Sequence, residues 1–205
     1  MRRCSHAGFS LLELMMTVAI LSVIAAFAVP SFQTLVMLNR LSSEANELVA
    51  ALGQARTEAI RMNRRTVLCR ATVSSGQVAT ASGCLAGEGS WAGWLMFVDA
   101  DGSGAYNPNA GTNPDEVVVR THVLNGTRLN ALPNSDLVTA GNRIVFRPDG
   151  LARAVGQTLL QSATLRLCEA ADGVAMNARD VRLGGGTRIS VTRVTSAACS
   201  VPEAS

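Results

Sequence analysis

Residues 7–30 read AGFSLLELMMTVAILSVIAAFAVP, and this stretch decides how the rest of the chain is interpreted. From Phe9 to Val29 every residue is apolar or small except Glu13. As an α-helix, residues 9–29 extend about 30 Å, which matches the hydrocarbon thickness of a bilayer. A carboxylate in hydrocarbon costs about 2.5–3.5 kcal/mol even on the lenient insertion scale, so Glu13 requires an explanation.

The rest of the chain is long enough for one ordinary domain, since the whole sequence has 205 residues. The 18 basic residues are all arginines, and the net charge is +3. If residues 1–8 are removed, 16 arginines remain against 15 acidic residues. This near balance gives no general attraction for nucleic acid, so any DNA-binding site must rest on a local cluster.

Four cysteines follow the apolar run, namely Cys69, Cys84, Cys168 and Cys199, and Cys4 precedes it. They show no metal-binding spacing, and an even number beyond an export segment predicts two disulfides in an oxidising compartment. Three pairings are possible. The pairs Cys69–Cys84 and Cys168–Cys199 are favoured because both close short loops, and each would stabilise the fold by roughly 3 kcal/mol.

Three interpretations of the apolar run compete. A cleaved secretory signal would use Ala26-Phe27-Ala28 as its cleavage site and would release a secreted protein beginning at Val29. Its apolar stretch is longer than the usual ~7–15 residues, however, and it contains a carboxylate. A plain signal anchor, with Arg2 and Arg3 in the cytoplasm, also leaves Glu13 unexplained. The third interpretation accounts for the carboxylate.

The string Gly8-Phe9-Ser10-Leu11-Leu12-Glu13 resembles the processing site of type IV prepilins and type II secretion pseudopilins. In that family a prepilin peptidase cuts after the glycine and methylates the new N-terminal residue. The resemblance therefore implies cleavage between Gly8 and Phe9. Glu13 then lies four residues from a positive α-amine on the same helix face.

A buried charge can be retained where an ammonium group of a neighbouring subunit matches it, and such a pair can set register. In the family this glutamate is credited with recruiting the subunit into the growing filament. Pro30 matches the family's helix kink, because proline lacks a backbone donor and clashes with the preceding turn.

Residues 30–63 are expected to extend the membrane helix (9–29) as an amphipathic helix, giving one long helix from about Phe9 to Asn63. Apolar residues recur at steps of three and four and predict a single stripe: Leu41, Ala45, Leu48, Leu52, Ala55, Ala59 and Met62. We expect this stripe to pack on the protein's own β-sheet. A two-chain coiled coil is disfavoured because three of the seven positions are alanine.

Residues 64–205 predict an antiparallel β domain, either one curved sheet or two packed sheets, because short alternating segments are separated by Gly, Pro, Asn and Asp. The expected strands are Thr66–Arg70, Trp94–Asp99, Glu116–Leu124, Arg143–Arg147, Thr164–Glu169, Asp180–Leu183 and Arg188–Val194. Gly184-Gly185-Gly186 predicts a hairpin turn between the last two. Trp94 is expected in the core and Trp91 at its rim.

Three stretches are similar to GspH/FimT-type minor pilins: residues 39–69, GWLMFVDADGSGAYN at 93–107 and RIVFRPDGLAR at 143–153. The resemblance implies an α+β, type IV pilin-like fold, in which a long N-terminal helix, transmembrane in its first half, packs on the β domain.

Asp99-Ala100-Asp101-Gly102-Ser103-Gly104 resembles the start of a calcium loop, because oxygen ligands occupy alternate positions. The glycine comes too early for an EF-hand, and Ala110 stands where the loop's last glutamate belongs. We therefore expect a polar turn and no metal. His122 has no nucleophile or acid at motif spacing, so no catalytic residue, cofactor or enzyme activity is expected.

Near the C-terminus, a local basic cluster comprises Arg179, Arg182, Arg188 and Arg193. Some FimT-like minor pilins are DNA receptors that use a C-terminal GRxR element, and the closest match here is Gly186-Thr187-Arg188 with Arg193. Strand positions five apart point to opposite faces, so Arg188 and Arg193 are not expected to act together. Arg182 and Arg188 are expected to face each other across the hairpin, and a solvated, charge-guarded strand edge is favoured over DNA binding.

These observations predict a minor pilin that is made with a leader (1–8), held in the bacterial inner membrane with its domain in the periplasm, and assembled through its N-terminal helix. The expected partners are the prepilin peptidase, other major and minor pilins or pseudopilins and the inner-membrane assembly platform. A type IV pilus is favoured, because the GW..F.D segment and paired cysteines are more FimT-like. A type II secretion pseudopilus and a pilus-associated DNA receptor remain alternatives.

Overall fold

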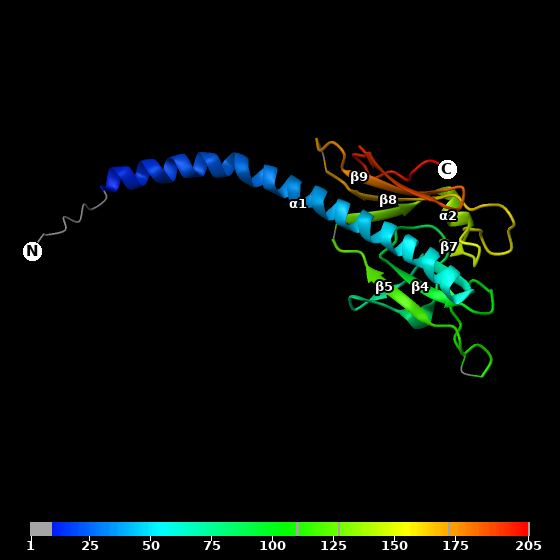
Figure 1. Ribbon diagram of the computed structural model, residues 1–205. Coiled ribbons are helices and arrows are strands. Elements are labelled where there is room, and N and C mark those ends of the chain that lie inside the picture. The colour runs from blue at the N-terminus through cyan, green and yellow to red at the C-terminus, as the bar shows by residue number, and fades with distance from the viewer. Residues whose placement is uncertain (1–9, 110, 127, 172, 205) are drawn as a thin grey trace, which may run out of the picture. The chain divides into compact units, whose positions relative to one another are not determined.

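The computed structural model describes residues 10–204 except 110, 127 and 172 (Figure 1). The leader, Gly8 and Phe9 therefore lie outside the described residues. The chain divides into two units, an N-terminal segment that ends at Met37 and a domain that begins at Leu38. One helix, α1 (Leu11–Met62), contributes to both units.

The domain half of α1 carries the expected apolar stripe. Six of the seven predicted positions are buried, from Leu41 to Ala59, and Ala51 joins them. The prediction for Met62 is wrong: its side chain is 40% exposed, because the helix ends there. Asn63 adopts a left-handed conformation (φ 51°), and the amides of Asn63 and Arg64 donate to Ile60 and Ala59, a Schellman-type end.

The β domain contains two four-stranded antiparallel sheets, so the two-sheet alternative is confirmed. The first has the order β5-β4-β1-β7 and the second β10-β9-β8-β6 (Figure 1). Their strands are β1 (Arg65–Arg70), β4 (Gly93–Asp99), β5 (Val118–Val123), β6 (Leu129–Pro133), β7 (Arg143–Phe146), β8 (Ala163–Glu169), β9 (Ala178–Gly184) and β10 (Arg188–Val194). The smaller elements are β2 (Val73–Ser74), β3 (Gln77–Val78), a 3-10 turn (Thr80–Ser82) and α2 (Ser135–Thr139).

One core cluster joins α1 to both sheets. It contains the stripe of α1, side chains of β1, β4 and β7, and side chains of β6, β8 and β9. Every residue of β4 is buried, because the opposite face of the first sheet carries a second apolar cluster around Val67, Leu95 and Phe97. The expected place of Trp91 at the rim is wrong: it is 2% exposed, and its indole N–H donates to Asn142 Oδ1 at 3.2 Å.

Polar contacts fix α1 to the sheets as well. Arg40 pairs with Glu169 at the end of β8. Glu44, only 5% exposed, has Oε2 2.8 Å from His122 Nε2 on β5 and accepts a hydrogen bond from the Asn125 amide. The imidazole also stacks on Trp94 at 5.5 Å between ring centroids. His122 therefore has a structural role between helix and sheet.

Two disulfides join the pairs that the sequence favours. Cys69 on β1 is bonded to Cys84 with an S–S distance of 2.04 Å, and Cys168 on β8 is bonded to Cys199. The second one holds the C-terminal tail, in which Ser196 is also buried and exchanges hydrogen bonds with Asn177. Each bridge connects a sheet to a loop that lacks a regular strand.

Arg70 organises the loop closed by the first disulfide. Its buried guanidinium donates four hydrogen bonds, of 2.5 to 3.1 Å, to the carbonyls of Leu85, Ala86, Glu88 and Gly89. Removing the donor would leave these carbonyls without partners, and a buried unsatisfied polar group costs about 1–3 kcal/mol.

We therefore expect Arg70→Ala to destabilise the protein by about 3 kcal/mol and to lower its melting temperature by about 6–12 °C. Fluorescence of the buried Trp91 and Trp94 reports the transition. Arg128→Ala removes an exposed arginine and serves as the control. Equal melting temperatures for the two variants would contradict this role of Arg70.

Candidate functional site

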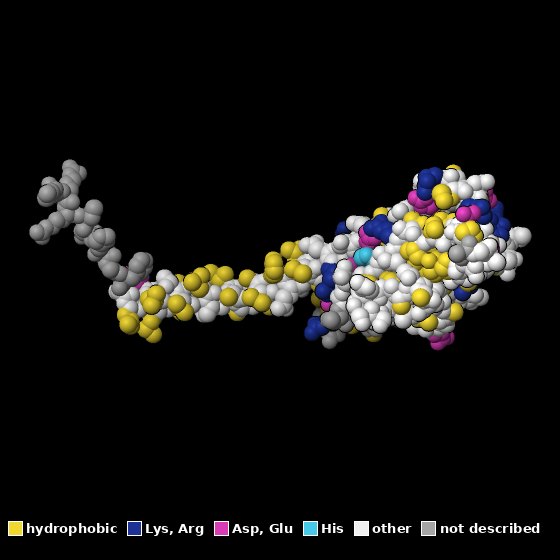
Figure 2. All heavy atoms as spheres, turned by 90° about the horizontal axis from the view of Figure 1, so that it is seen from below, with side chains coloured by type: hydrophobic (Ala, Val, Ile, Leu, Met, Phe, Trp, Pro, Cys, Tyr) yellow, Lys and Arg dark blue, Asp and Glu magenta, His cyan; other side chains and the backbone are white. Residues whose placement is uncertain are grey.

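The N-terminal half of α1 is an apolar helix with no covering in the structure. Its side chains are exposed from Ser10 to Gln33, and Phe27 reaches 78%. The most apolar 18-residue window has a mean hydropathy of 2.3, so by length and composition this helix is able to cross a membrane. Figure 2 shows hydrophobic side chains following one another along it.

The uncovered apolar stretch is longer than the predicted membrane helix (9–29). Phe32, Leu35 and Val36 are still exposed, and the first buried side chain of the helix is Met37. The helix also continues through Pro30 without interruption. Residues 30–36 were predicted to be part of the amphipathic extension. Most of them are exposed, however, like the residues of the apolar segment.

Glu13 lies in the first turn of α1, where the structure shows a helix cap that was not predicted from the sequence. Ser10 precedes the helix, and its hydroxyl accepts a hydrogen bond from the Glu13 amide at 3.2 Å. Ser10 and Glu13 thus have the spacing of a capping box, and a carboxylate near a helix N-terminus is favoured by the helix dipole. Among the described residues none hydrogen-bonds or pairs with the Glu13 carboxylate, so it is available to an outside group.

The candidate DNA-binding arginines do not form one patch. The register of β9 and β10 sets Arg182 opposite Ser190 and Arg188 opposite Gly184, so Arg182 and Arg188 are diagonal neighbours on one face. Arg193 lies opposite Arg179 on the other face, as the spacing predicts. All three candidates are exposed.

Arg179, the fourth member of the sequence cluster, is not available to a ligand. Its guanidinium donates to the carbonyls of Met176 and Ala178 and to the Ser42 hydroxyl of α1. Burial, and then the nearby charge of Arg193, lower the pKa of Arg179. Arg182 and Arg188 therefore remain as the only exposed pair on one face among the described members of this cluster.

The structure also brings together three acidic residues whose proximity was not predicted from the sequence. Asp99 and Asp101 belong to the predicted polar turn, and Glu116 joins them from the segment that precedes β5. No local sequence pattern predicts this contact, because 14 intervening residues separate Asp101 from Glu116. The only hint is the acidic segment that follows the GW..F.D stretch.

Two protein-family models match the sequence. A family model described as Type II transport protein GspH matches residues 44–192, and one described as Prokaryotic N-terminal methylation motif matches residues 3–29. No curated protein shows a significant match to the chain.

Among solved structures, the chain is similar to two crystal forms of the type IV minor pilin FimU from Pseudomonas aeruginosa. In the first, the identity is 20%, with 75% of this chain and 89% of that chain covered, and the TM-score is 0.45. In the second, the identity is again 20%, with coverages of 74% and 92%, and the TM-score is 0.43.

The methylation motif implies processing by a prepilin peptidase and assembly with other pilins, and with the apolar helix it is consistent with anchoring in the inner membrane before assembly. The GspH match covers well over half of the sequence. The chain therefore belongs to the GspH family of minor pilins and pseudopilins, which are structural proteins and not enzymes.

Proposed function

We propose that this protein is a minor pilin of a type IV pilus, anchored in the inner membrane until its N-terminal helix enters the filament. The single observation that carries the proposal is the uncovered apolar helix with one carboxylate. From Ser10 to Asn39 the only charged residue is Glu13. Such a surface is stable only in lipid or against other apolar helices.

The proposed assembly step starts with cleavage between Gly8 and Phe9, which leaves a methylated, positively charged amine on Phe9. Glu13 lies one helical turn away. In the filament, the carboxylate of one subunit accepts hydrogen bonds from the amine of its neighbour, and the low dielectric strengthens their attraction. An unpaired carboxylate in the same surroundings is strongly unfavourable, so the pair selects the assembled register.

The assignment to a type IV pilus rests on resemblance at particular residues. The GW..F.D pattern occupies β4, and the Cys69–Cys84 bridge packs on the outer face of the first sheet. Both features are more FimT-like than typical of secretion pseudopilins. The alternative is a minor pseudopilin of a type II secretion system, and the description of the matching family favours it.

Deletion of the gene separates these two functions. A type IV pilus protein predicts loss or strong reduction of surface pili and of pilus-driven movement, with unchanged export of folded exoproteins. The reverse result, normal pili with accumulation of exoproteins in the periplasm, would assign the protein to type II secretion.

We expect Glu13→Gln to be cleaved and inserted in the membrane at wild-type levels, but to fall roughly tenfold or more in sheared filaments. The reason is that Gln is nearly isosteric but cannot neutralise a neighbouring amine; a tenfold loss corresponds to about 1.4 kcal/mol. Immunoblots of membrane and filament fractions measure both quantities. Glu58→Gln, which removes a helix carboxylate whose one ion pair among the described residues is with Arg61, is the matched control. Equal incorporation of both variants would contradict the role of Glu13.

The DNA-receptor alternative is supported by the exposed Arg182 and Arg188 on one sheet face. It predicts that the full chain in detergent binds short duplex DNA at low salt and that Arg182→Ala with Arg188→Ala abolishes the binding. Arg193→Ala, on the opposite face, should retain it. Absence of binding by the wild-type chain at low salt would eliminate this alternative. Fluorescence anisotropy of labelled DNA is a suitable measurement.

A further inference from the structure

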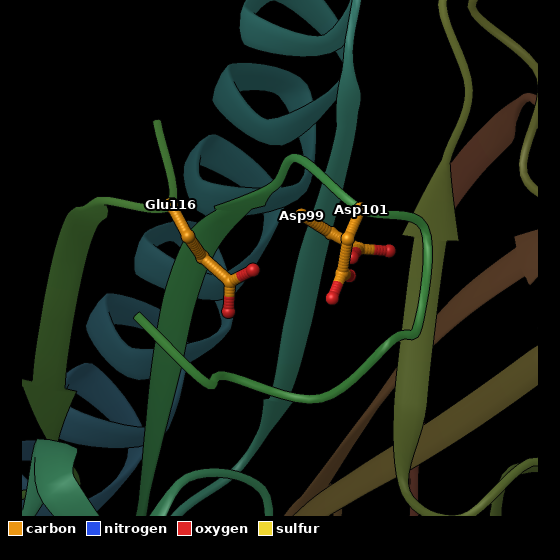
Figure 3. A group of neighbouring side chains, drawn as sticks. All are labelled: Asp99, Asp101 and Glu116. Atoms are coloured by element: carbon orange, nitrogen blue, oxygen red, sulfur yellow. The ribbon is translucent and has the colours of Figure 1, made fainter. Parts of the chain in front are cut away.

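Three carboxylates converge at the edge of the first sheet. Asp99 is the last residue of β4, Asp101 follows in the next loop, and Glu116 precedes β5 (Figure 3). One carboxylate oxygen of each residue lies within 4.8 Å of those of the other two. Asp99 and Glu116 are buried, with 1% and 3% of their surface exposed, whereas Asp101 is exposed. Buried carboxylates this close need a compensating positive charge or a shared proton.

Two arginines lie beside the cluster, but their hydrogen bonds go to other groups. Arg64 pairs with Asp115 at 3.2 Å and donates to the carbonyl of Ala100. Arg65, opposite Asp99 in the register of β1 and β4, donates to the carbonyl of Gly102 at 2.6 Å. Neither forms an ion pair with the three carboxylates. Burial, and next the neighbouring carboxyl of Asp101, raise the pKa of Asp99 to about 6.

One oxygen of the cluster is orphaned. Asp99 Oδ2 accepts a hydrogen bond from the Gly104 amide at 3.1 Å, but Oδ1 is fully buried and has no hydrogen-bond partner. A buried polar atom without a partner is rare in folded proteins and requires an explanation. Because this atom belongs to a carboxylate held among two others, a cation satisfies it better than a further hydrogen-bond donor would.

The other two carboxylates are held in position by hydrogen bonds that leave lone pairs available. Glu116 accepts from the Asn107 amide and from the Asn113 side chain, and Asp101 accepts from the Ser103 amide at 2.9 Å and from the Asn107 side chain at 3.2 Å. An ionised carboxylate has about four lone-pair sites, so each retains acceptor capacity. The cluster is thus organised before any ligand arrives.

We propose that Asp99, Asp101 and Glu116 form a calcium site that ties the loop between β4 and β5 to the first sheet. All three ligands are oxygens, which hard cations prefer and zinc does not. Two oxygens bound to one calcium ion at about 2.3–2.6 Å lie at most about 5 Å apart, which fits the spacing. Magnesium needs contacts of about 2.0–2.1 Å in strict octahedral geometry and suits the cluster less well.

The proposed site differs from the calcium loop considered from the sequence alone. An EF-hand takes its ligands from one continuous stretch of 12 residues, about the length of a single short loop. Here Glu116 comes from the far end of the connection between the two strands. A bound ion would therefore cross-link both ends of this connection, and its binding energy would stabilise the folded domain.

The test uses the full chain in detergent, freed of metal with a chelator, and follows thermal unfolding by tryptophan fluorescence. At calcium concentrations about a hundredfold above the dissociation constant, the melting temperature should rise by about 5–10 °C. We expect a dissociation constant of about 10⁻⁴–10⁻³ M, the class of extracellular calcium modules. Magnesium should give a smaller rise, and an equal or larger response to magnesium would overturn the assignment to calcium.

Substitutions test which residues the calcium-induced rise in melting temperature requires. Asp99→Asn and Asp101→Asn should each reduce the calcium-induced rise below about 2 °C, and Asp101 is exposed in a loop, so its variant should fold even if the other does not. Asp115→Asn removes a neighbouring carboxylate outside the cluster and should retain the rise. In chelator, Asp99→Asn should melt no lower than wild type, because the amide removes the charge repulsion. No response in the wild-type chain, or the same response in Asp101→Asn, would overturn the proposal.

Discussion

A single carboxylate in a long apolar helix restricts the environments in which this protein is stable. Glu13 is the only charge between Ser10 and Asn39, and its surroundings offer no described partner. Lipid tolerates the apolar side chains but not the charge, and water tolerates the charge but not the side chains. In the filament that we propose, another subunit supplies both an amine and an apolar surface, so both conditions are met there.

The domain, in contrast, is complete in itself. Its stretch of α1 presents alanines that allow the helix to approach both sheets, and the larger leucines fill the space between them. Polar contacts between α1 and the sheets flank this apolar core. Arg40 pairs with Glu169, Glu44 contacts His122, and the Ser42 hydroxyl accepts a hydrogen bond from Arg179. Because its own helix supplies the core, we expect the domain to fold without the filament.

Predictions from the sequence were correct where the local spacing of apolar residues determines which side chains are buried. The stripe of α1 was predicted from spacing, and six of its seven positions are buried because the pattern continues until the helix ends. The strand β6 was missed because it contains Asn130, Ala131 and Pro133, residues with little strand preference. Pairing with β8 decides its conformation, and Pro133 is tolerated because β6 is an edge strand.

Contacts between polar residues from different elements were harder to predict from local sequence patterns. Glu44 lies outside the predicted apolar stripe, yet it is buried and contacts His122 of β5. Glu116 was predicted only as the start of a strand, and β5 in fact begins at Val118. Its approach to Asp99 follows from the pairing of β4 with β5. The faces of Arg188 and Arg193 could be predicted, since alternation along a strand is local. Which charges meet across the fold depends on topology, and no single stretch encodes it.

The mass of the N-terminal peptide of the protein purified from cells decides whether Glu13 has its amine partner. We expect a mature chain that begins with methylated Phe9, so that a positive amine stands one helical turn from the carboxylate of Glu13. A chain that begins at Val29, or one that retains residues 1–8, would lack that amine at that place. Either result would contradict the account.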